Sequence, residues 1–258
     1  MPDRPFHFAR RICTVGAVSG LLPDPIGSSS QRFAALQLRG AAGPLTAQVR
    51  WPGAPGAGTP PPPLLLYFDD AARPAPAVAS ALCAEAGVVV LAPRCRALHD
   101  AFWPAFCDAA AALEWAADHA AELGADGGRL LVAGHWRAAR LAAALAIHAR
   151  DHGWPRLMRQ VLICPRLRAI PTGGGSYVAP PLVACAGLAP ATFLLPRGSS
   201  PPDDGARYAR RLALAGVAVE ELHVTGAPER GVEDLARLLR PHLARRDVDL
   251  DVARSSSE

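Results

Sequence analysis

The five residues from Gly134 to Ala138, Gly-His-Trp-Arg-Ala, follow a buried-looking apolar run and open a long Ala/Leu-rich segment. A sharp strand-to-helix turn of this kind often carries a nucleophilic serine, in the pattern Gly-x-Ser-x-Gly. Here Trp136 occupies the central position. An indole N–H donates a hydrogen bond but is not a nucleophile. Trp136 is therefore expected either to fill the space of a lost site or to serve as a platform on which a ligand stacks.

Charged residues stand where predicted strands end. Asp69 and Asp70 follow the apolar run Leu-Leu-Leu-Tyr-Phe, Arg137 lies in the turn, and Arg230 directly precedes the last predicted helix. Carboxyl ends of parallel strands lie at one edge of a sheet, and ligands bind there. We expect an aspartate to pair with one of the arginines, because unpaired buried charge is costly. The alternative is a site for an anionic ligand, built from both arginines and the helix N-terminus after Trp136.

The other residues that could act as a base, a nucleophile or a metal ligand are weaker candidates. His135 is a candidate base or ligand contact, but no general-acid partner is evident in the sequence. The remaining histidines considered are expected to face solvent, namely His99, His119, His148, His152 and His223. The serines away from the termini do not lie on strand-to-helix turns, namely Ser80, Ser176, Ser199 and Ser200. No His/Cys/Asp cluster has metal-ligand spacing, so neither a metal nor another cofactor is expected.

The amino-acid composition excludes several classes of protein. The chain has 258 residues, half of them hydrophobic, and a formal net charge of only +4. Its arginines are scattered and fit the coding bias of a GC-rich genome, which argues against a nucleic-acid partner. The six cysteines lack Cys-x-x-Cys spacing, which favours reduced thiols in a cytoplasmic protein over a zinc site or disulfides. No apolar run reaches the ~18 residues of a membrane span, so no membrane partner is expected.

The N-terminus allows a second interpretation of location. Two arginines precede a short apolar run at Phe8–Leu22, as in a signal peptide, but no clear cleavage site follows. Export is therefore the minor alternative to a cytoplasmic location. We expect residues 1–30 to be irregular, residues 31–246 to form one domain, and residues 247–258 to be a disordered tail.

Apolar periodicity predicts an α/β fold. A hairpin comes first, and strands then alternate with helices, which indicates βαβ units and a mostly parallel sheet. The order of the strands does not follow from the pattern. Strands are expected at 32–40, 44–51, 64–70, 87–93, 129–134, 159–165, 191–196 and 217–224, and helices at 75–86, 104–124, 203–216 and 231–246, besides the Ala/Leu-rich run that ends at Gly153.

These pieces together resemble the hormone-sensitive-lipase-like, or fold-3, carboxylesterases of the α/β-hydrolase fold superfamily. The likeness is carried by the stretches GPLTAQVRWPG, PPPLLLYFDD, FCDAAAALEWAADHAAELGADGGRLLVAG and PPDDGARYARRLALAGVAVE. It extends over roughly residues 35–245. The resemblance implies one domain with a mostly parallel central sheet of about seven to eight strands, helices on both faces and a reduced cap.

The resemblance also implies a Ser-Asp-His triad with an oxyanion hole of backbone N–H groups. The serine position falls on Trp136, and the second elbow glycine falls on Ala138. The His-Gly-Gly-Gly oxyanion motif falls on Asp69, Asp70 and Ala71, with Ala72 following. Carboxylates there would oppose the negative charge that an oxyanion hole has to stabilise.

The remaining two triad positions carry equally unsuitable groups. The acid position falls on Ser199, which lacks the charge that stabilises an imidazolium. The histidine position falls on Arg230, whose guanidinium stays protonated and is no base. The segment between VLICPRL and PPLVACAG is also too short for the usual cap helices. We therefore predict a reduced pocket and catalytic motifs that have degraded.

Three classes of function follow. The first is a non-catalytic homologue that binds a small anionic or acyl ligand or regulates a partner, with His135, Trp136, Arg137 and Arg230 as ligand contacts. The second is a carboxylic-ester hydrolase with a non-standard site. The third is an assembly partner, for example a homodimer formed through a sheet edge and the last helix. The sequence does not name the ligand.

Overall fold

A computed structural model describes residues 32–53, 59–70, 74–96, 102–167, 184–197, 204–226 and 229–244. The irregular segment expected at 1–30 and the tail expected at 247–258 lie outside these ranges, so the domain boundaries stay a prediction. The same holds for several positions named above, namely Ala71, Ala72, His99, Ser176, Ser199 and Ser200.

The described elements follow the predicted order of a hairpin and then alternating helices and strands. They are β1 (Arg32–Gly40), β2 (Gly43–Trp51), β3 (Pro63–Phe68), α1 (Pro76–Ala86), β4 (Val89–Pro93), α2 (Phe102–His119), η1 (Ala121–Leu123), β5 (Asp126–His135), η2 (Trp136–Ala138), α3 (Ala139–His152), β6 (Leu157–Ile163), β7 (Ala191–Pro196), α4 (Asp204–Leu214), β8 (Val219–Val224) and α5 (Glu229–Leu243). The helix expected at 104–124 ends earlier, at His119, and a 3₁₀ turn leads to the left-handed Gly124.

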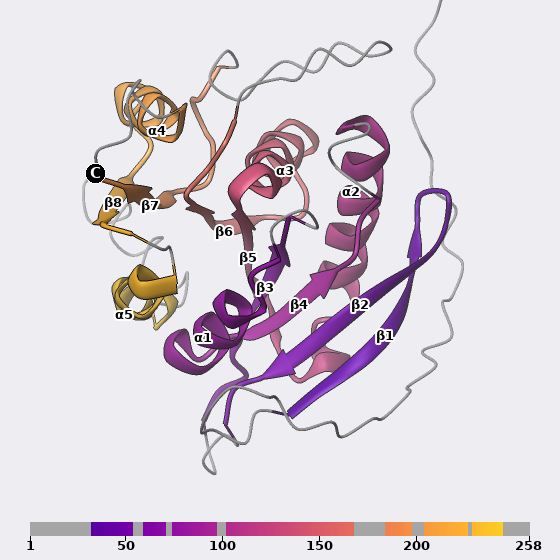
Figure 1. Ribbon diagram of the computed structural model, residues 1–258. Coiled ribbons are helices and arrows are strands. Elements are labelled where there is room, and N and C mark those ends of the chain that lie inside the picture. Colours follow the sequence, from indigo (N-terminus) through magenta and orange to yellow (C-terminus); the bar gives the residue numbers. More distant parts are fainter. Residues whose placement is uncertain are drawn as a thin grey trace, which may run out of the picture.

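The eight strands form one sheet in the order β1-β2-β4-β3-β5-β6-β7-β8. β1 pairs with β2 and β2 with β4 in antiparallel fashion, whereas every pair from β4 to β8 is parallel. This confirms the predicted class, a mostly parallel sheet preceded by a hairpin. Figure 1 shows the twisted sheet as a fan that runs from the β1–β2 hairpin to β8 at the opposite edge.

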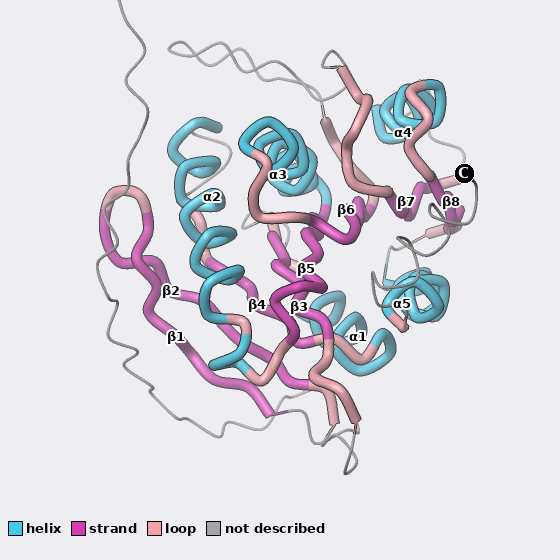
Figure 2. Tube along the Cα trace, turned by 180° about the vertical axis from the view of Figure 1, so that it is seen from behind, coloured by secondary structure: helices cyan, strands magenta, loops and turns pink. Residues whose placement is uncertain are grey.

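Helices cover both faces of the sheet. α1 and α5 lie together on one face, whereas α2, α3 and α4 lie on the other (Figures 1 and 2). Every residue of β3 is buried, as expected for a central strand that is covered on both sides. The core therefore has two layers, one beneath α1 and α5 and one beneath α2 and α3, and the second layer continues beneath α4.

Burial shifts the pKa of a cysteine and of a histidine in this fold. Cys83, Cys164 and Cys185 are buried free thiols, and burial raises the pKa of Cys83 to about 12. The expectation that His148 faces solvent is wrong. Its ring is half-buried against Phe106, and its pKa is lowered first by burial and then by the neighbouring charge of His152. His119 is likewise half-buried, with its ring stacked on that of Trp115, so the same expectation is wrong for it.

A polar cluster bridges three strands and α5 away from the elbow. Arg159 on β6 is 6% exposed, and its Nη1 donates to Thr192 Oγ1 at 2.7 Å and to Glu220 Oε2 at 3.1 Å. His242 Nε2 lies 2.6 Å from the other oxygen of Glu220. Burial lowers the pKa of Arg159, whereas the Glu220 carboxylate opposes that shift. The carboxylate of Glu220 therefore compensates the buried positive charge of Arg159.

Replacing Glu220 with alanine should lower the free energy of unfolding by about 2–3 kcal/mol, because it leaves Arg159 buried without its carboxylate. The change is measured by chemical denaturation. The matched control is Glu221→Ala on the same strand, where the side chain is exposed and should contribute no more than about 0.5 kcal/mol. An Arg159→Met/Glu220→Ala double variant should regain most of the loss. Equal effects at 220 and 221 would contradict this assignment.

Candidate functional site at the carboxyl edge of the sheet

The turn after β5 has the strained geometry that its sequence predicts. His135 is extended, Trp136 has a φ of +54°, and the chain enters α3 through a 3₁₀ turn. A positive φ is unusual for a large L-residue and marks strain. Gly134 makes the turn sterically possible, because a Cβ there would lie 2.6 Å from the carbonyl oxygen of Ala138 and from Cα of Ala139.

The strand register places the Asp69-Asp70 pair beside this turn. Phe68 on β3 pairs with Gly134 on β5, so the next residues of the two strands, Asp69 and His135, come together. Asp69 Oδ1 lies 3.3 Å from His135 Nδ1, and its carboxylate also accepts the backbone N–H groups of Asp70 and Ala75. Asp69 therefore closes the loop before α1 and holds the buried ring of His135.

Asp70 makes the ion pair expected at this edge. Its Oδ2 accepts the Nε–H of Arg137 at 2.9 Å, with the carboxylate side chain 4% exposed and the arginine side chain 32% exposed. The aspartate is thereby compensated, and the charge of Arg137 is neutralised within the protein. The sequence predicted that Arg137 or Arg230 would pair with an aspartate here. In the structure, Arg137 makes this ion pair with Asp70.

Trp136 is half-buried and lies between an apolar cluster and a cation. On one side it packs against the core layer beneath α1 and α5. On the other side, the guanidinium carbon of Arg166 lies 4.4 Å from the ring centroid, a distance typical of a cation–π contact. The backbone N–H of Arg166 also donates to the Trp136 carbonyl at 3.0 Å. Both expectations for Trp136 thus have support, since it fills space and also presents an aromatic face.

Arg230 lies at the start of α5 and is exposed. It makes no ion pair with Asp69 or Asp70. Its neighbour Gly231 fixes the position of the helix, because a Cβ there would lie 2.8 Å from Leu194 Cδ1. The N-terminus of α5 is thus held against β7 and β8, at the same edge of the sheet as Trp136.

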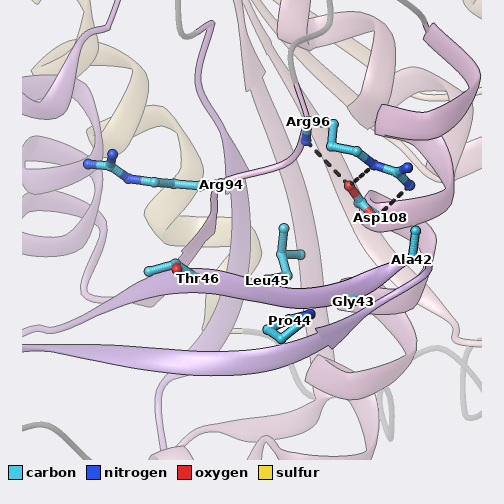
Figure 3. A pocket seen from close by; sticks show the side chains of 8 residues that line it. All are labelled: Ala42, Gly43, Pro44, Leu45, Thr46, Arg94, Arg96 and Asp108. Atoms are coloured by element: carbon cyan, nitrogen blue, oxygen red, sulfur yellow. Dashed lines mark hydrogen bonds and ion pairs between the residues drawn. The ribbon is translucent and has the colours of Figure 1, made fainter.

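A separate open cavity of about 310 Å³ lies beside the β1–β2 hairpin. It is lined by Ala42, Gly43, Pro44, Leu45, Thr46, Arg94, Arg96 and Asp108, none of which belongs to the elbow. Figure 3 shows the Arg96–Asp108 ion pair at its wall, while the Arg94 side chain extends away from that pair. Whether a reduced pocket lies beside Trp136 stays a prediction.

Sequence reasoning missed two important side chains. Asp108 is 4% exposed although α2 places it among buried alanines, and a charged residue on an apolar stripe is the signal that would have identified it. Arg166 follows the strand that ends in Pro165, and only the tertiary structure brings it over Trp136. Within the described ranges, no three His, Cys, Asp or Glu side chains are arranged to hold a metal ion. No described helix is long and apolar enough to cross a membrane.

Chemically, the described edge offers aromatic stacking and charged hydrogen-bond donors. Trp136 supplies no nucleophile at the elbow. Asp69 accepts three hydrogen bonds, and Asp70 is engaged by Arg137. Arg166, which contacts the Trp136 ring, is by contrast exposed.

Comparisons with known proteins agree with this architecture. Residues 68–179 match a family described as α/β hydrolase fold. The chain is 33% identical over 146 residues to Esterase LipI of Mycobacterium tuberculosis and 32% identical over 148 residues to Carboxylesterase NlhH of the same organism. Each match covers 44% of this chain and 46% of the relative, so the matched region spans about half the length of these curated proteins.

Solved structures match over most of the described fold. An esterase of Pyrobaculum calidifontis superposes with a TM-score of 0.69 at 24% identity, covering 81% of this chain and 85% of that one. EstE1, a carboxylesterase cloned from a metagenomic library, superposes with a TM-score of 0.71 at 22% identity, covering 87% and 92%. At these identities the superpositions establish the fold alone. The chain therefore has the α/β-hydrolase fold, and its resemblance is to the hormone-sensitive-lipase-like carboxylesterases.

Proposed function

We propose that this protein is a non-catalytic α/β-hydrolase homologue, with a binding or regulatory role carried by the edge of the sheet around Trp136. The observation that carries the proposal is the residue on the strained turn after β5. Trp136 has a φ of +54° there, where an esterase of this fold needs a serine.

The surroundings of Trp136 support the same conclusion. Asp69 and Asp70 follow β3, where the fold would require donors for an oxyanion. Both carboxylates are already engaged, one by backbone N–H groups and His135 and the other by Arg137. An ester oxygen that develops negative charge beside them would meet repulsion rather than stabilisation.

The acid and base positions add a sequence argument. The resemblance assigns them to Ser199 and Arg230, and neither side chain performs the task of the group it replaces. Arg230 is exposed at the start of α5. We infer from this that loss of activity involves the whole set of catalytic groups rather than the nucleophile alone.

The alternative is a carboxylic-ester hydrolase with a non-standard site. The names of the curated relatives favour it, and so does one contact. Asp69 lies 3.3 Å from Nδ1 of the buried His135, and a carboxylate in that position orients a histidine that acts as a base. This alternative requires that a hydroxyl or a water molecule be activated by His135.

Ester hydrolysis separates the two proposals. The wild-type protein and a Trp136→Ser variant should both turn over p-nitrophenyl acetate at less than ~0.1 s⁻¹, about a hundredfold below the typical ~10 s⁻¹ of enzymes. Restoring the serine alone leaves the oxyanion and base positions unsuitable. Loss of a single oxyanion donor already costs roughly 10²–10³ in turnover, and catalytic groups act as a unit.

Buffer and a Trp103→Ser variant serve as controls, since Trp103 is an exposed tryptophan on α2. Turnover by the wild-type protein that His135→Asn abolishes would establish the alternative. Turnover above ~0.1 s⁻¹ by Trp136→Ser alone would mean that the acid and base lie at other positions than those assigned.

A further inference from the structure

The geometry points to a binding site for a small oxyanion, a carboxylate or a phosphate, built on Arg166 and completed by Arg197 and Arg230. The inference rests on the proposed binding role of this edge and names the chemistry of the ligand. The sequence-based expectation instead used Arg137, Arg230 and the helix N-terminus after Trp136. Arg137 is neutralised by Asp70, so the recognising cation is Arg166.

Arg166 is held in place without using its side-chain donors. Its backbone N–H is bonded to the Trp136 carbonyl, and its guanidinium carbon lies 4.4 Å from the centroid of the indole ring. A cation–π contact uses the charge of the guanidinium and not its five N–H donors. Arg166 is exposed and makes no ion pair with any described residue. It therefore presents a positioned fork of donors, the geometry that binds carboxylate and phosphate in bidentate fashion.

Two further arginines, Arg197 and Arg230, lie at the same edge of the sheet as Arg166. Neighbouring strands of a sheet lie about 4.8 Å apart, so Arg197, directly after β7, stands one strand away from the end of β6. The N–H of Arg197 donates to the Val224 carbonyl at 2.7 Å, which fixes its backbone beside the end of β8. Arg230 lies in the first turn of α5, which packs against β7 and β8.

The described carboxylates at this edge do not neutralise these three arginines. Asp69 and Asp70 are engaged as described above, and Asp204, in the first turn of α4, forms no ion pair with any of them. Arg197 and Arg230 are exposed and likewise have no described acidic partner. An anion bound at this edge would balance their positive charge and accept charge-assisted hydrogen bonds from them.

The test measures the thermal stability of the full-length protein against increasing sodium phosphate or sodium acetate, with sodium chloride at matched ionic strength as the reference. A ligand that binds only the folded state raises Tm in a saturable way. Wild type should show such a rise with at least one of the two anions, and the anion that is preferred distinguishes a phosphate from a carboxylate ligand. Arg166→Gln should raise the half-saturating concentration about tenfold or more, since a hydrogen bond to a charged group contributes at least about that factor.

The matched control is Arg32→Gln. Arg32 also stacks on a tryptophan, with its guanidinium carbon 5.5 Å from the ring centroid of Trp51, but it lies on β1 at the far edge of the sheet. This variant should respond as wild type does. General stabilisation by phosphate is common to both variants and cancels in the comparison. Arg197→Gln removes a neighbouring charge without touching the stack on Trp136, and it should weaken binding several-fold.

Equal responses of Arg166→Gln, Arg197→Gln and wild type would overturn the inference, as would the absence of any saturable rise in wild type. The outcome is separable from that of the proposed function, because ester turnover is measured on the same preparation. An inactive protein that binds no oxyanion would refute only the ligand class. An active one would refute the non-catalytic role, whichever anion it binds.

Discussion

Replacing Gly134 with alanine should lower the free energy of unfolding by about 3 kcal/mol, the upper end of what overpacking usually costs. The added Cβ would lie 2.6 Å from the Ala138 carbonyl oxygen and the Ala139 Cα, and 2.7 Å from the Ala139 nitrogen. These are backbone atoms at the start of α3, so no side-chain rotation relieves the clash. Either α3 must move away from β5, or the turn that holds Trp136 must open.

Gly53→Ala is the matched control for this experiment. A Cβ at Gly53 would meet no atom within 4 Å, so its unfolding free energy should change by no more than about 0.5 kcal/mol. Thermal unfolding of both variants provides the comparison, with each kcal/mol corresponding to roughly 2–4 °C in a domain of this size. A Gly134→Ala variant as stable as Gly53→Ala would mean that the turn after β5 is looser than its geometry indicates.

The class of fold could be predicted because several local signals agree. The run Leu64–Phe68 is apolar throughout, which suits a strand covered on both faces, and helical segments separate it from the next apolar runs. The sheet order could not be derived in the same way. Strand β4 lies between β2 and β3, although β3 precedes it in the chain. Such a crossover depends on tertiary packing, which local periodicity does not encode.

In the candidate site, only contacts between residues that stand just after neighbouring strands could be predicted from the sequence. Asp70 and Arg137 each stand two residues after strands that a parallel sheet brings together, so their ion pair follows from register. Arg166 stands three residues after β6, and its stacking on Trp136 depends on a turn through Cys164, which has a φ of +45°. A positive φ at a non-glycine residue is not readable from residue type. The cation that the proposed ligand site needs was therefore found only in the structure.

The two edges of the fold differ in how their charges are used. At the carboxyl ends of β6 and β7, exposed arginines lack described acidic partners, which is why a ligand is proposed there. Beside the β1–β2 hairpin, the charges are satisfied within the protein. Asp108 Oδ2 accepts the Nε–H of Arg96 at 2.8 Å (Figure 3). Its Oδ1 accepts the backbone N–H of Ala41 at 3.2 Å. The hairpin cavity is thus bordered by a structural ion pair.

Replacing Asp108 with alanine should therefore destabilise the protein by about 2–4 kcal/mol without affecting oxyanion binding. The Asp108 side chain is 6% exposed and joins the hairpin turn, α2 and the chain after β4, so its loss leaves the N–H of Ala41 without its acceptor. The estimate stays below the full cost of a broken buried pair, because the Arg96 side chain is 45% exposed and can be hydrated.

Chemical denaturation measures this loss, and hydrogen exchange at residues 40–43 localises it. Asp118→Ala is the control, because Asp118 is an exposed aspartate on the same helix. Burial first, and then the charge of Asp118, raise the pKa of Glu114, so this aspartate opposes a neighbouring carboxylate rather than stabilising a cation. Asp108→Asn should fall between the two, since the amide keeps one acceptor oxygen but loses the charge. If Asp108→Ala is no less stable than Asp118→Ala, or if exchange does not rise at the hairpin, the ion pair does not hold this edge together. If Asp108→Ala also weakens anion binding, the two edges are coupled and the ligand site extends further along the sheet than Arg166, Arg197 and Arg230.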